Sequence, residues 1–201
     1  ENSKGNTKLT SLEYVETGSQ TGGVPLSSQA RCLGVFEDGS KDRIYWFVHD
    51  PAFTVGLTKK LDLIVSLNPT TNNLAYHVIS IDDGSGVNTT LNFNPSHLVT
   101  AVNKIEDLLF FTDNFNPPRV INVLENYPFP NFNLDVMTAE ELLVIKKPPI
   151  NAPLLTLKSQ QNNQDDFLKE RFICFAYRYQ YANGEFSATS QWTEPAFDPG
   201  I

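Results

Sequence analysis

Three histidines are the side chains of this sequence best suited to acid–base chemistry. His49, His77 and His97 each lie in or near an apolar, strand-like run. An imidazole placed between a serine and a carboxylate activates a serine nucleophile. The sequence has no Gly-x-Ser-x-Gly motif, which would hold a serine on a sharp turn between a strand and a helix. A Ser-His-Asp assembly therefore stays open as a hypothesis, and no catalytic residue is predicted.

Carboxylates form a second group of candidates. Asp50, Asp113 and Asn114 directly follow apolar runs. Asp and Asn at such positions commonly accept hydrogen bonds from backbone N–H groups of the next turn, so we expect turn capping there rather than a ligand site. Glu140 and Glu141 are adjacent, so they diverge on a helix and cannot hold one substrate together. Nothing singles out a distant pair for glycoside hydrolysis.

One loop has the composition of a cation site. Residues 82–88 read Asp-Asp-Gly-Ser-Gly-Val-Asn, which places side-chain oxygens on a Gly-containing turn, as calcium prefers. The loop lacks the alternating ligands and the final bidentate glutamate of an EF-hand, so a solvated hairpin tip is the favoured interpretation. Two cysteines and three scattered histidines form no structural zinc site. No metal ligand and no cofactor is predicted.

The two cysteines and a row of tyrosines have both a structural and a functional interpretation. Cys32 and Cys174 lie in apolar runs, which favours buried free thiols over a disulfide. Tyr177, Tyr179 and Tyr181 recur at every second position, which places them on one face of a strand. Such a row is more typical of a sandwich core than of a platform on which sugars stack.

The composition restricts the classes of partner. The 201 residues include 15 Lys and Arg against 23 Asp and Glu, a net charge of −8. Contact with phosphates needs a basic surplus, so the composition argues against a nucleic-acid binder and a polybasic membrane-surface module. A hydrophobic content of 40% indicates a folding chain. We find no signal peptide and no membrane-spanning run, and interpret the chain as a soluble fragment of a longer protein.

Alternating apolar residues predict an all-β fold. Residues 44–49 alternate with apolar side chains on both faces, which is typical of a strand buried on both sides. Residues 63–67 predict a second strand, which the loop 68–73 joins to a third at 74–78. A further short strand is expected at 12–15.

A second group of strands is predicted at 99–102, 107–113 and 119–123. Residues 108–114 align with residues 44–50 at an offset of 64, longer than the roughly 40 to 50 residues of common propeller blades. A propeller-type repeat and a plain antiparallel sandwich both remain open. Thr138 and Glu141 have the spacing of a capping box, which predicts one short helix.

A boundary is predicted at Pro148-Pro149. Beyond it we expect a strand at 152–157, and then a hairpin formed by 172–181 and 186–192. Asn183-Gly184 between these two runs is a strong hairpin signal, because both residues tolerate the left-handed backbone of a tight turn.

Three stretches carry a resemblance to a known family. Residues 41–48 (Lys-Asp-Arg-Ile-Tyr-Trp-Phe-Val) and 107–119 (Asp-Leu-Leu-Phe-Phe-Thr-Asp-Asn-Phe-Asn-Pro-Pro-Arg) resemble blade segments of phage tail proteins. The series resembles the muzzle or stabilization proteins of crAss-like gut bacteriophages. Residues 171–188 are the most specific part and are similar to a fibronectin-III-like hairpin in such proteins. The resemblance spans residues 30 to 195.

The resemblance implies a structural function in the virion. β-Propeller and β-sandwich modules would assemble around a DNA exit channel at the end of a short tail. The expected fold is a propeller-like antiparallel region over 1–146 and a fibronectin-III-like β-sandwich region over 147–201. Expected partners are other virion tail proteins and, in the full-length protein, further copies in a homo-oligomeric ring. The chain is too short for a closed propeller, and no catalytic residue is carried over.

Two alternatives remain, together with one electrostatic idea. The chain could be a secreted or cell-surface module of a gut bacterium that binds glycan or protein. It could also be a propeller-type hydrolase, the least favoured of the three. If the chain lines a channel, its acidic surface would repel DNA and let it slide past.

Overall fold

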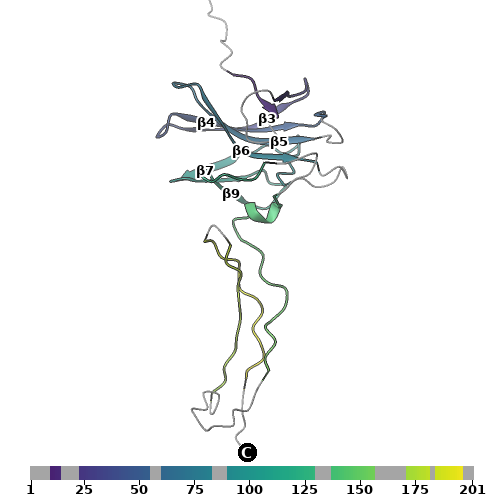
Figure 1. Cartoon of the computed structure of the whole chain (residues 1–201), viewed down its shortest axis with the longest axis vertical. Coiled ribbons are helices and arrows are strands. Elements are labelled where there is room, and N and C mark those ends of the chain that lie inside the picture. Colours follow the sequence, from purple (N-terminus) through teal and green to yellow (C-terminus); the bar gives the residue numbers. More distant parts are fainter. Residues whose placement is uncertain are drawn as a thin grey trace, which may run out of the picture. The chain divides into compact units, whose positions relative to one another are not determined.

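The computed structural model shows a mainly β chain whose strands pair antiparallel, as the all-β prediction expects (Figure 1). The chain divides into two compact units, Glu1–Val144 and Ile145–Ile201. We call them the N-terminal and the C-terminal unit. The residues that the structure describes are 10–14, 23–54, 60–82, 90–129, 137–156, 171–181 and 184–196.

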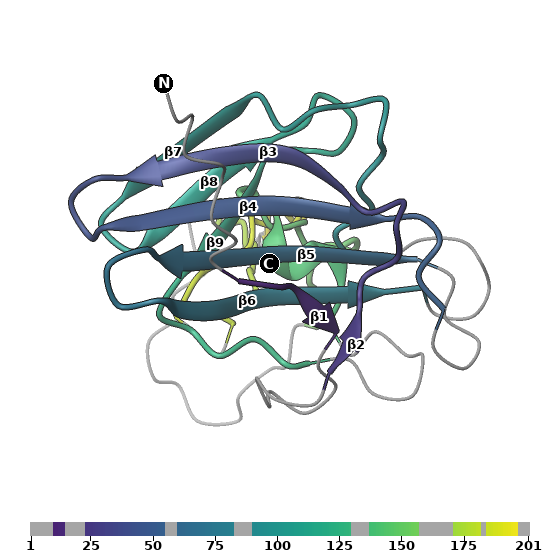
Figure 2. The same ribbon diagram turned by 90° about the horizontal axis from the view of Figure 1, so that it is seen from above.

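The larger sheet of the N-terminal unit is a four-stranded antiparallel meander (Figure 2). Its strands are β3 (Arg31–Asp38), β4 (Arg43–Asp50), β5 (Leu61–Asn68) and β6 (Asn73–Ile81). They lie in sequence order, so each pair is joined by a direct connection. The two inner strands, β4 and β5, are paired on both sides.

Both faces of this sheet are buried at its inner strands, β4 and β5. On β4, Tyr45 and Phe47 belong to one apolar cluster, while Val48 belongs to another against which Trp46 packs. The prediction of a strand buried on both sides is therefore confirmed. Each fully buried large apolar side chain contributes about 1.5–3 kcal/mol to folding, so this double burial is a major source of stability.

The hairpin of β5 and β6 is also confirmed. Asn68 pairs with Asn73 across a four-residue turn, in which Asn72 adopts a positive φ of 54°. Asn tolerates this left-handed backbone better than most residues. Further along, Ile64 pairs with Val78 and Val65 with Tyr76, so β6 carries a bulge at His77.

The smaller sheet packs on the inner face of the larger one. It contains β7 (Ala101–Ile105), β8 (Leu108–Thr112) and β9 (Arg119–Asn122), again in sequence order. The rings of Phe47 and Phe111 lie 5.0 Å apart between the two sheets. Strands were predicted in all three places, but β7 begins later than expected, because the Val99 N–H bonds to the Leu33 carbonyl of β3.

A short pair of strands covers the outer face of the larger sheet. β1 (Glu13–Tyr14) and β2 (Val24–Pro25) pair antiparallel, and Figure 2 shows them in front of β5 and β6. Tyr14 is buried in the outer apolar cluster, 5.3 Å from the ring of Phe53. The strand expected at 12–15 is thus present as β1.

The short helix is one 3₁₀ turn, η1 (Ala139–Leu142). The Thr138 N–H donates to Glu141 Oε1 at 3.2 Å, which is one half of the expected capping box. The helix stops because Leu143 has an extended backbone and forms a bridge with Arg119 at the start of β9.

The C-terminal unit contains an irregular hairpin. Residues 171–181 and 184–196 run antiparallel through backbone bonds that join Tyr177 to Ser190 and Tyr179 to Ser187. Between these two pairs the first segment advances by two residues and the second by three. Because the spacing is unequal, the segments form isolated bridges instead of a regular ladder. The predicted pairing is right and the predicted regular strands are wrong. Over 152–156 the expected strand is absent; residue 157 lies outside the described part.

Serine and threonine hydroxyls explain this irregularity. The N–H groups of Phe175, Tyr177 and Tyr179 do not bond to carbonyls across the hairpin. They donate to the hydroxyl oxygens of the opposite segment at 2.9–3.1 Å, which belong in that order to Thr193, Ser190 and Ser187. Hydroxyls compete with carbonyls for backbone donors, and here they replace them.

Candidate functional site

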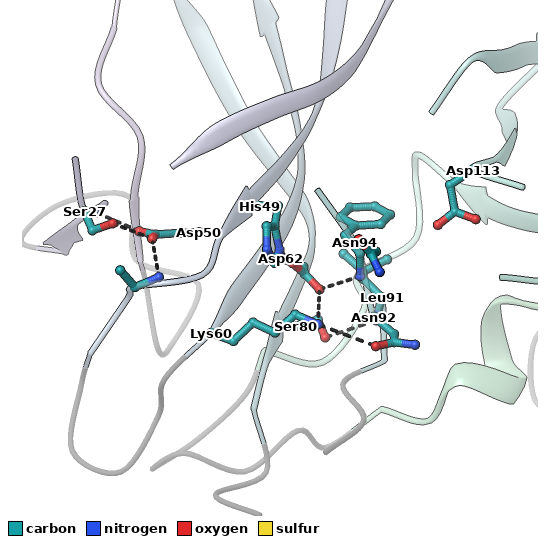
Figure 3. Close-up of polar contacts among 12 residues, drawn as sticks. Ser27, His49, Asp50, Lys60, Asp62, Ser80, Leu91, Asn92, Asn94 and Asp113 are labelled. Atoms are coloured by element: carbon teal, nitrogen blue, oxygen red, sulfur yellow. Dashed lines mark hydrogen bonds and ion pairs between the residues drawn. The ribbon is translucent and has the colours of Figure 1, made fainter. Parts of the chain in front are cut away.

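A row of polar side chains crosses the inner face of the larger sheet (Figure 3). His49 on β4 lies opposite Asp62 on β5, which in turn lies opposite Ser80 on β6. Their exposed fractions are 2%, 0% and 0%. We call His49, Asp62 and Ser80 the inner polar row. It is the place in the described part where the residue types of a serine hydrolase come together.

Asp62 is the centre of this row. Its Oδ1 lies 2.6 Å from His49 Nδ1, and its Oδ2 accepts the Phe93 N–H at 2.9 Å. Lys60 Nζ lies 3.9 Å from Oδ2. A buried carboxylate is costly unless it is paired and hydrogen-bonded, and these contacts meet that need.

The segment 90–94 is tied to both sheets, as Figure 3 shows in part. From the larger sheet, Ser80 Oγ accepts the Leu91 N–H at 3.1 Å. From the smaller sheet, Arg119 donates to the Leu91 carbonyl. The Asn116 amide donates to the Asn92 carbonyl at 3.0 Å. The polar residues therefore fasten one connecting segment between two sheets.

Arg119 is a buried cation at the start of β9. Burial lowers the pKa of its guanidinium, while the carboxylates of Asp113 and Asp62 oppose that effect. Its Nε has no hydrogen-bond partner among the described residues. The charge of Arg119 is thus balanced by two acids, one near each sheet.

The inner polar row does not have the geometry of a catalytic triad. In a triad the imidazole lies between the serine and the carboxylate, so that it can take the serine proton. Here the carboxylate of Asp62 occupies the middle of the row, and Ser80 Oγ accepts a backbone N–H. All three side chains are closed to solvent.

A second serine–histidine contact lies further along the same sheet. Arg43 donates to Ser66 Oγ at 2.9 Å, and Ser66 Oγ lies 2.8 Å from His77 Nε2. Burial, and then the charge of Arg43, lowers the pKa of His77 to about 4, so the imidazole is neutral at pH 7. Its remaining ring N–H bonds to the Val123 carbonyl. Among the residues that the structure describes, no carboxylate orients this imidazole, and Ser66 is fully buried.

Two of the strand-end acids cap turns, as predicted. Asp50 accepts the Ala52 N–H at 3.1 Å and the Ser27 N–H at 2.6 Å. Asp113 accepts the N–H groups of Phe115 and Asn116 at 3.0 and 2.8 Å. Asn114, which directly follows Asp113, has a positive φ of 57°. These carboxylates hold loops in place and have little capacity left for a ligand.

The other candidates are not brought together. His97 stacks on Phe115 at 4.9 Å, and Glu141 binds back to Thr138. Asp82 is buried, and its N–H donates to the Lys60 carbonyl; residues 83–88 of the predicted loop lie outside the described part. In the described ranges no group of three or more His, Cys, Asp and Glu is placed to hold a metal ion.

Two sequence interpretations need correction. Cys32 and Cys174 are free, as predicted, but both are exposed instead of buried. Cys32 lies on β3, an edge strand of its sheet, and Cys174 on the irregular hairpin. The tyrosine row is not a core in this chain, since the exposed fractions of Tyr177 and Tyr179 are 39% and 51%.

Two hollows open on the N-terminal unit. One is an apolar groove of about 270 Å³ on the outer face, lined in part by Leu12, Leu26 and Trp46. The other, of about 450 Å³, lies between the turns after β3 and β7 and is polar. In it, Lys104 Nζ lies 2.8 Å from Asp38 Oδ2. Burial raises the pKa of Asp38, but bonds from Lys104 and Ser40 outweigh burial and lower it.

Sequence reasoning missed the two charged residues that matter most here. Asp62 interrupts the apolar run Leu-Asp-Leu-Ile-Val, and Arg119 opens the run Arg-Val-Ile. A charge within a strand buried on both faces must have a partner. That rule could have identified Asp62, but no spacing in the sequence shows that Arg119 lies near it.

The described part contains no helix long and apolar enough to cross a membrane. Its polar clusters are buried, its strand-end acids close turns, and its largest exposed aromatic surface belongs to the C-terminal unit. Comparison of the chain with protein-family models, with curated proteins and with solved structures found no match.

Proposed function

We propose that this chain is a structural component of a phage tail, of the muzzle or nozzle type, that works through protein–protein contacts. One observation carries the proposal. The polar pairs that the fold brings together, His49 with Asp62 and Ser66 with His77, are buried and bonded to the fold, whereas large apolar side chains are exposed. An exposed apolar patch is typical of a surface that binds another protein.

The exposed apolar side chains are concentrated in the C-terminal unit. Exposed large apolar residues there are Ile145, Ile150, Leu154, Leu155, Phe172, Phe175, Tyr177, Tyr179, Phe186 and Trp192. Within the described part of that unit, the buried apolar side chains are Pro149 and Ala196. A unit with so little core of its own is better suited to assembly than to isolated existence.

The distribution of charge fits a role in assembly beside DNA. Residues 1–144 contain nine Lys and Arg against seventeen Asp and Glu, whereas residues 145–201 contain six of each. Five of the acids, Asp38, Asp50, Asp62, Asp82 and Asp113, are buried. A negative channel wall would therefore depend on the exposed acids, such as Glu37, Asp42 and Glu106.

A propeller-like N-terminal region and a fibronectin-III-like C-terminal region are part of this proposal. The aromatic inner strands β4 and β8 of two antiparallel sheets support a propeller-like N-terminal region. The hairpin of residues 171–196 supports a fibronectin-III-like C-terminal region. Completion of either architecture would come from further copies or from other tail proteins.

The test is to find the protein in the virion. We expect mass spectrometry of gradient-purified phage particles to detect this chain at a fixed ratio to the portal protein, and labelling in electron microscopy to place it on the tail. Portal, capsid and terminase genes should lie beside its gene. Absence from purified particles, or a gene without such neighbours, would overturn the proposal.

A binding module of a bacterial surface is the second candidate, because the aromatic rings of the C-terminal unit are exposed. Tyr177 and Tyr179 lie 6.0 Å apart and could stack on a sugar. A glycan array separates the two functions. Binding that is lost in the Tyr177→Ala/Tyr179→Ala variant would support this candidate, and an array without signal would oppose it.

A further inference from the structure

The first segment of the C-terminal hairpin has two backbone edges, of which one is bonded. Along residues 173–181 the backbone groups of every odd-numbered residue bond to the second segment. The Tyr177 N–H donates to Ser190 Oγ at 3.1 Å, and the Tyr177 carbonyl accepts the Ser190 N–H at 2.8 Å. Because successive residues of an extended chain direct their backbone groups to opposite sides, the even-numbered residues direct theirs away from the second segment.

The even-numbered residues form an unpaired strand edge. We call their backbone N–H and C=O groups the outer edge, which belongs to Cys174, Ala176, Arg178 and Gln180. Among the residues that the structure describes, no hydrogen bond joins these backbone groups to another segment. Ala176 is half-buried and the other three residues are exposed. Donors and acceptors that recur at every second residue of an exposed segment are a template for a further strand.

The larger sheet of the N-terminal unit protects its edge strands in ways that the outer edge lacks. On β3 the Leu33 carbonyl accepts the Val99 N–H at 2.9 Å, and β6 carries a bulge at His77. Covering segments, bulges and prolines all hinder pairing at a sheet edge. Residues 171–181 contain no proline, so each residue of the outer edge has an N–H to donate.

We propose that the outer edge binds an extended, acidic segment of a partner protein by strand addition. The inference rests on the proposed function in that both require a protein partner, and it names the surface and the chemistry of that partner. In strand addition the backbone bonds give affinity and alternate side chains give specificity. On one face of the added strand, side chains would lie beside Phe175, Tyr177 and Tyr179, which favours β-branched residues there.

Charge selects an acidic partner over a second copy of the same edge. The charged residues in the described part of the C-terminal unit are the basic Lys146, Lys147, Arg171 and Arg178 and the acidic Glu185 and Glu194. Glu185 already pairs with Lys146 at 3.2 Å. Arg178 lies over the ring of Phe186, with Cζ 3.8 Å from the centroid, and forms no ion pair with a described residue. An acid opposite Arg178 on the added strand would supply its cross-strand partner, whereas two basic edges repel each other.

A labelled peptide and the purified full chain test this inference. The probe is fluorescein-Val-Thr-Val-Glu-Val-Thr-Val-amide, whose glutamate can lie opposite Arg178, and binding is followed by fluorescence polarisation. We expect a dissociation constant below about 1 mM. Ala176→Pro should raise it about tenfold or more, because proline removes one outward N–H and its ring obstructs the added strand. The matched control Ala176→Ser keeps the N–H and should leave the constant unchanged, and circular dichroism should show all three proteins folded.

Modified peptides test the same inference on the wild-type chain, so the test does not depend on the folding of a variant. One peptide carries N-methyl groups on both threonines and the glutamate, and the other carries them on the last three valines. Because only one of these sets directs its N–H groups to the outer edge, only one peptide should bind about tenfold or more weakly. Replacing the glutamate by glutamine should weaken binding up to about fivefold, and this loss should disappear in Arg178→Gln.

Three results would overturn the inference: no binding up to about 1 mM, equal weakening by both N-methylated peptides, or equal affinity for the glutamate and glutamine peptides. A wild-type dimer that is lost in Ala176→Pro, together with no peptide binding, would assign the outer edge to a second copy and would also overturn it. A chain that is present in virions but binds no peptide would reject only strand addition. A chain that binds the peptide but is absent from virions would reject only the tail function.

Discussion

The two units of this chain place their apolar side chains in opposite ways. In the N-terminal unit, residues such as Phe47, Ile64 and Phe111 are enclosed between two sheets. In the C-terminal unit, Phe172, Tyr179 and Trp192 face solvent. Both units are rich in aromatic residues, so composition does not explain the difference. The difference comes from whether a second sheet covers the first.

The backbone hydrogen bonds form a regular ladder in the N-terminal unit and an irregular pattern in the C-terminal unit. In the larger sheet, β4 and β5 exchange bonds residue by residue, from Ile44 and Leu67 to Asp50 and Leu61. In the hairpin, hydroxyls of Ser187 and Ser190 accept bonds that carbonyls would take in a ladder. The comparison teaches that the N-terminal unit holds the enclosed core of the chain, whereas the described part of the C-terminal unit leaves its large apolar side chains exposed.

The largest expected effect is a loss of stability that occurs when a ring is removed from the N-terminal unit but not when one is removed from the C-terminal unit. Phe47→Ala removes a fully buried ring and should lower the free energy of unfolding by about 4 kcal/mol. Tyr177→Ala removes an exposed ring and should change it by less than about 0.5 kcal/mol. Urea unfolding of the monomer in a Trp192→Phe background, followed by Trp46 fluorescence, reports on the N-terminal unit. Similar losses for both variants would contradict the comparison.

The inner polar row should also carry stability. Asp62→Ala leaves His49 and the Phe93 N–H without their carboxylate, which should cost about 3 kcal/mol, as for other broken buried pairs. The matched control Glu37→Ala removes an exposed acid and should change stability by less than about 0.5 kcal/mol. The same fluorescence measurement applies. An Asp62→Ala variant with the wild-type free energy of unfolding would show that the inner polar row does not stabilise the fold.

His77 should make the N-terminal unit sensitive to acid. Its pKa is about 4 in the folded chain against 6.5 for a free imidazole, so the unfolded chain binds the proton more readily. Its contribution to stability is therefore complete above pH 6.5 and is lost as the pH falls towards 4. Between pH 7 and pH 5 the loss amounts to about 2 kcal/mol.

Urea unfolding at the two pH values measures this loss. His77→Gln should remove about 2 kcal/mol of the difference between pH 7 and pH 5, because the glutamine does not titrate. The control Val35→Ala changes an exposed side chain that has no titratable group, and it should retain the wild-type difference between the two pH values. Identical pH dependence in His77→Gln and wild type would show that His77 does not titrate as the buried contacts require.

The smallest effect concerns the hairpin alone. Ser190→Ala removes the oxygen that accepts the Tyr177 N–H at 3.1 Å. The free energy of opening the hairpin at this bond should fall by about 1 kcal/mol. Hydrogen exchange at the Tyr177 amide should then be about fivefold faster, and the unfolding of the N-terminal unit should not change. Thr189→Ala is the control, since the neighbouring Thr189 is exposed. Equal exchange in both variants would mean that the hydroxyl does not hold the hairpin.

Much of the fold could be predicted from local pattern. The strands β4, β5, β6, β8 and β9 and the capping of η1 follow from alternation and from Thr138 with Glu141. The turn-capping roles of Asp50 and Asp113 follow from their place after apolar runs. These features depend on residues close in sequence, so their chemistry can be read without the tertiary structure.

The site could be predicted only in part. The sequence named His49 and His77 but paired neither with its partner. His49 meets Asp62 because β4 and β5 align in one register. His77 meets Ser66 across a bulge of β6. Register and bulges arise from pairing between distant segments, and no spacing within one segment reveals them.

By itself the sequence determined the β class, the strand-rich N-terminal part and the hairpin at Gly184. It also determined that the net negative charge lies in residues 1–144, while residues 145–201 have no net charge. Only the tertiary structure decided that Asp62 and Arg119 are buried, that both thiols are exposed and that the tyrosine row faces solvent. The physical reason is that alternation specifies which side chains share a face, whereas burial depends on whether another element covers that face.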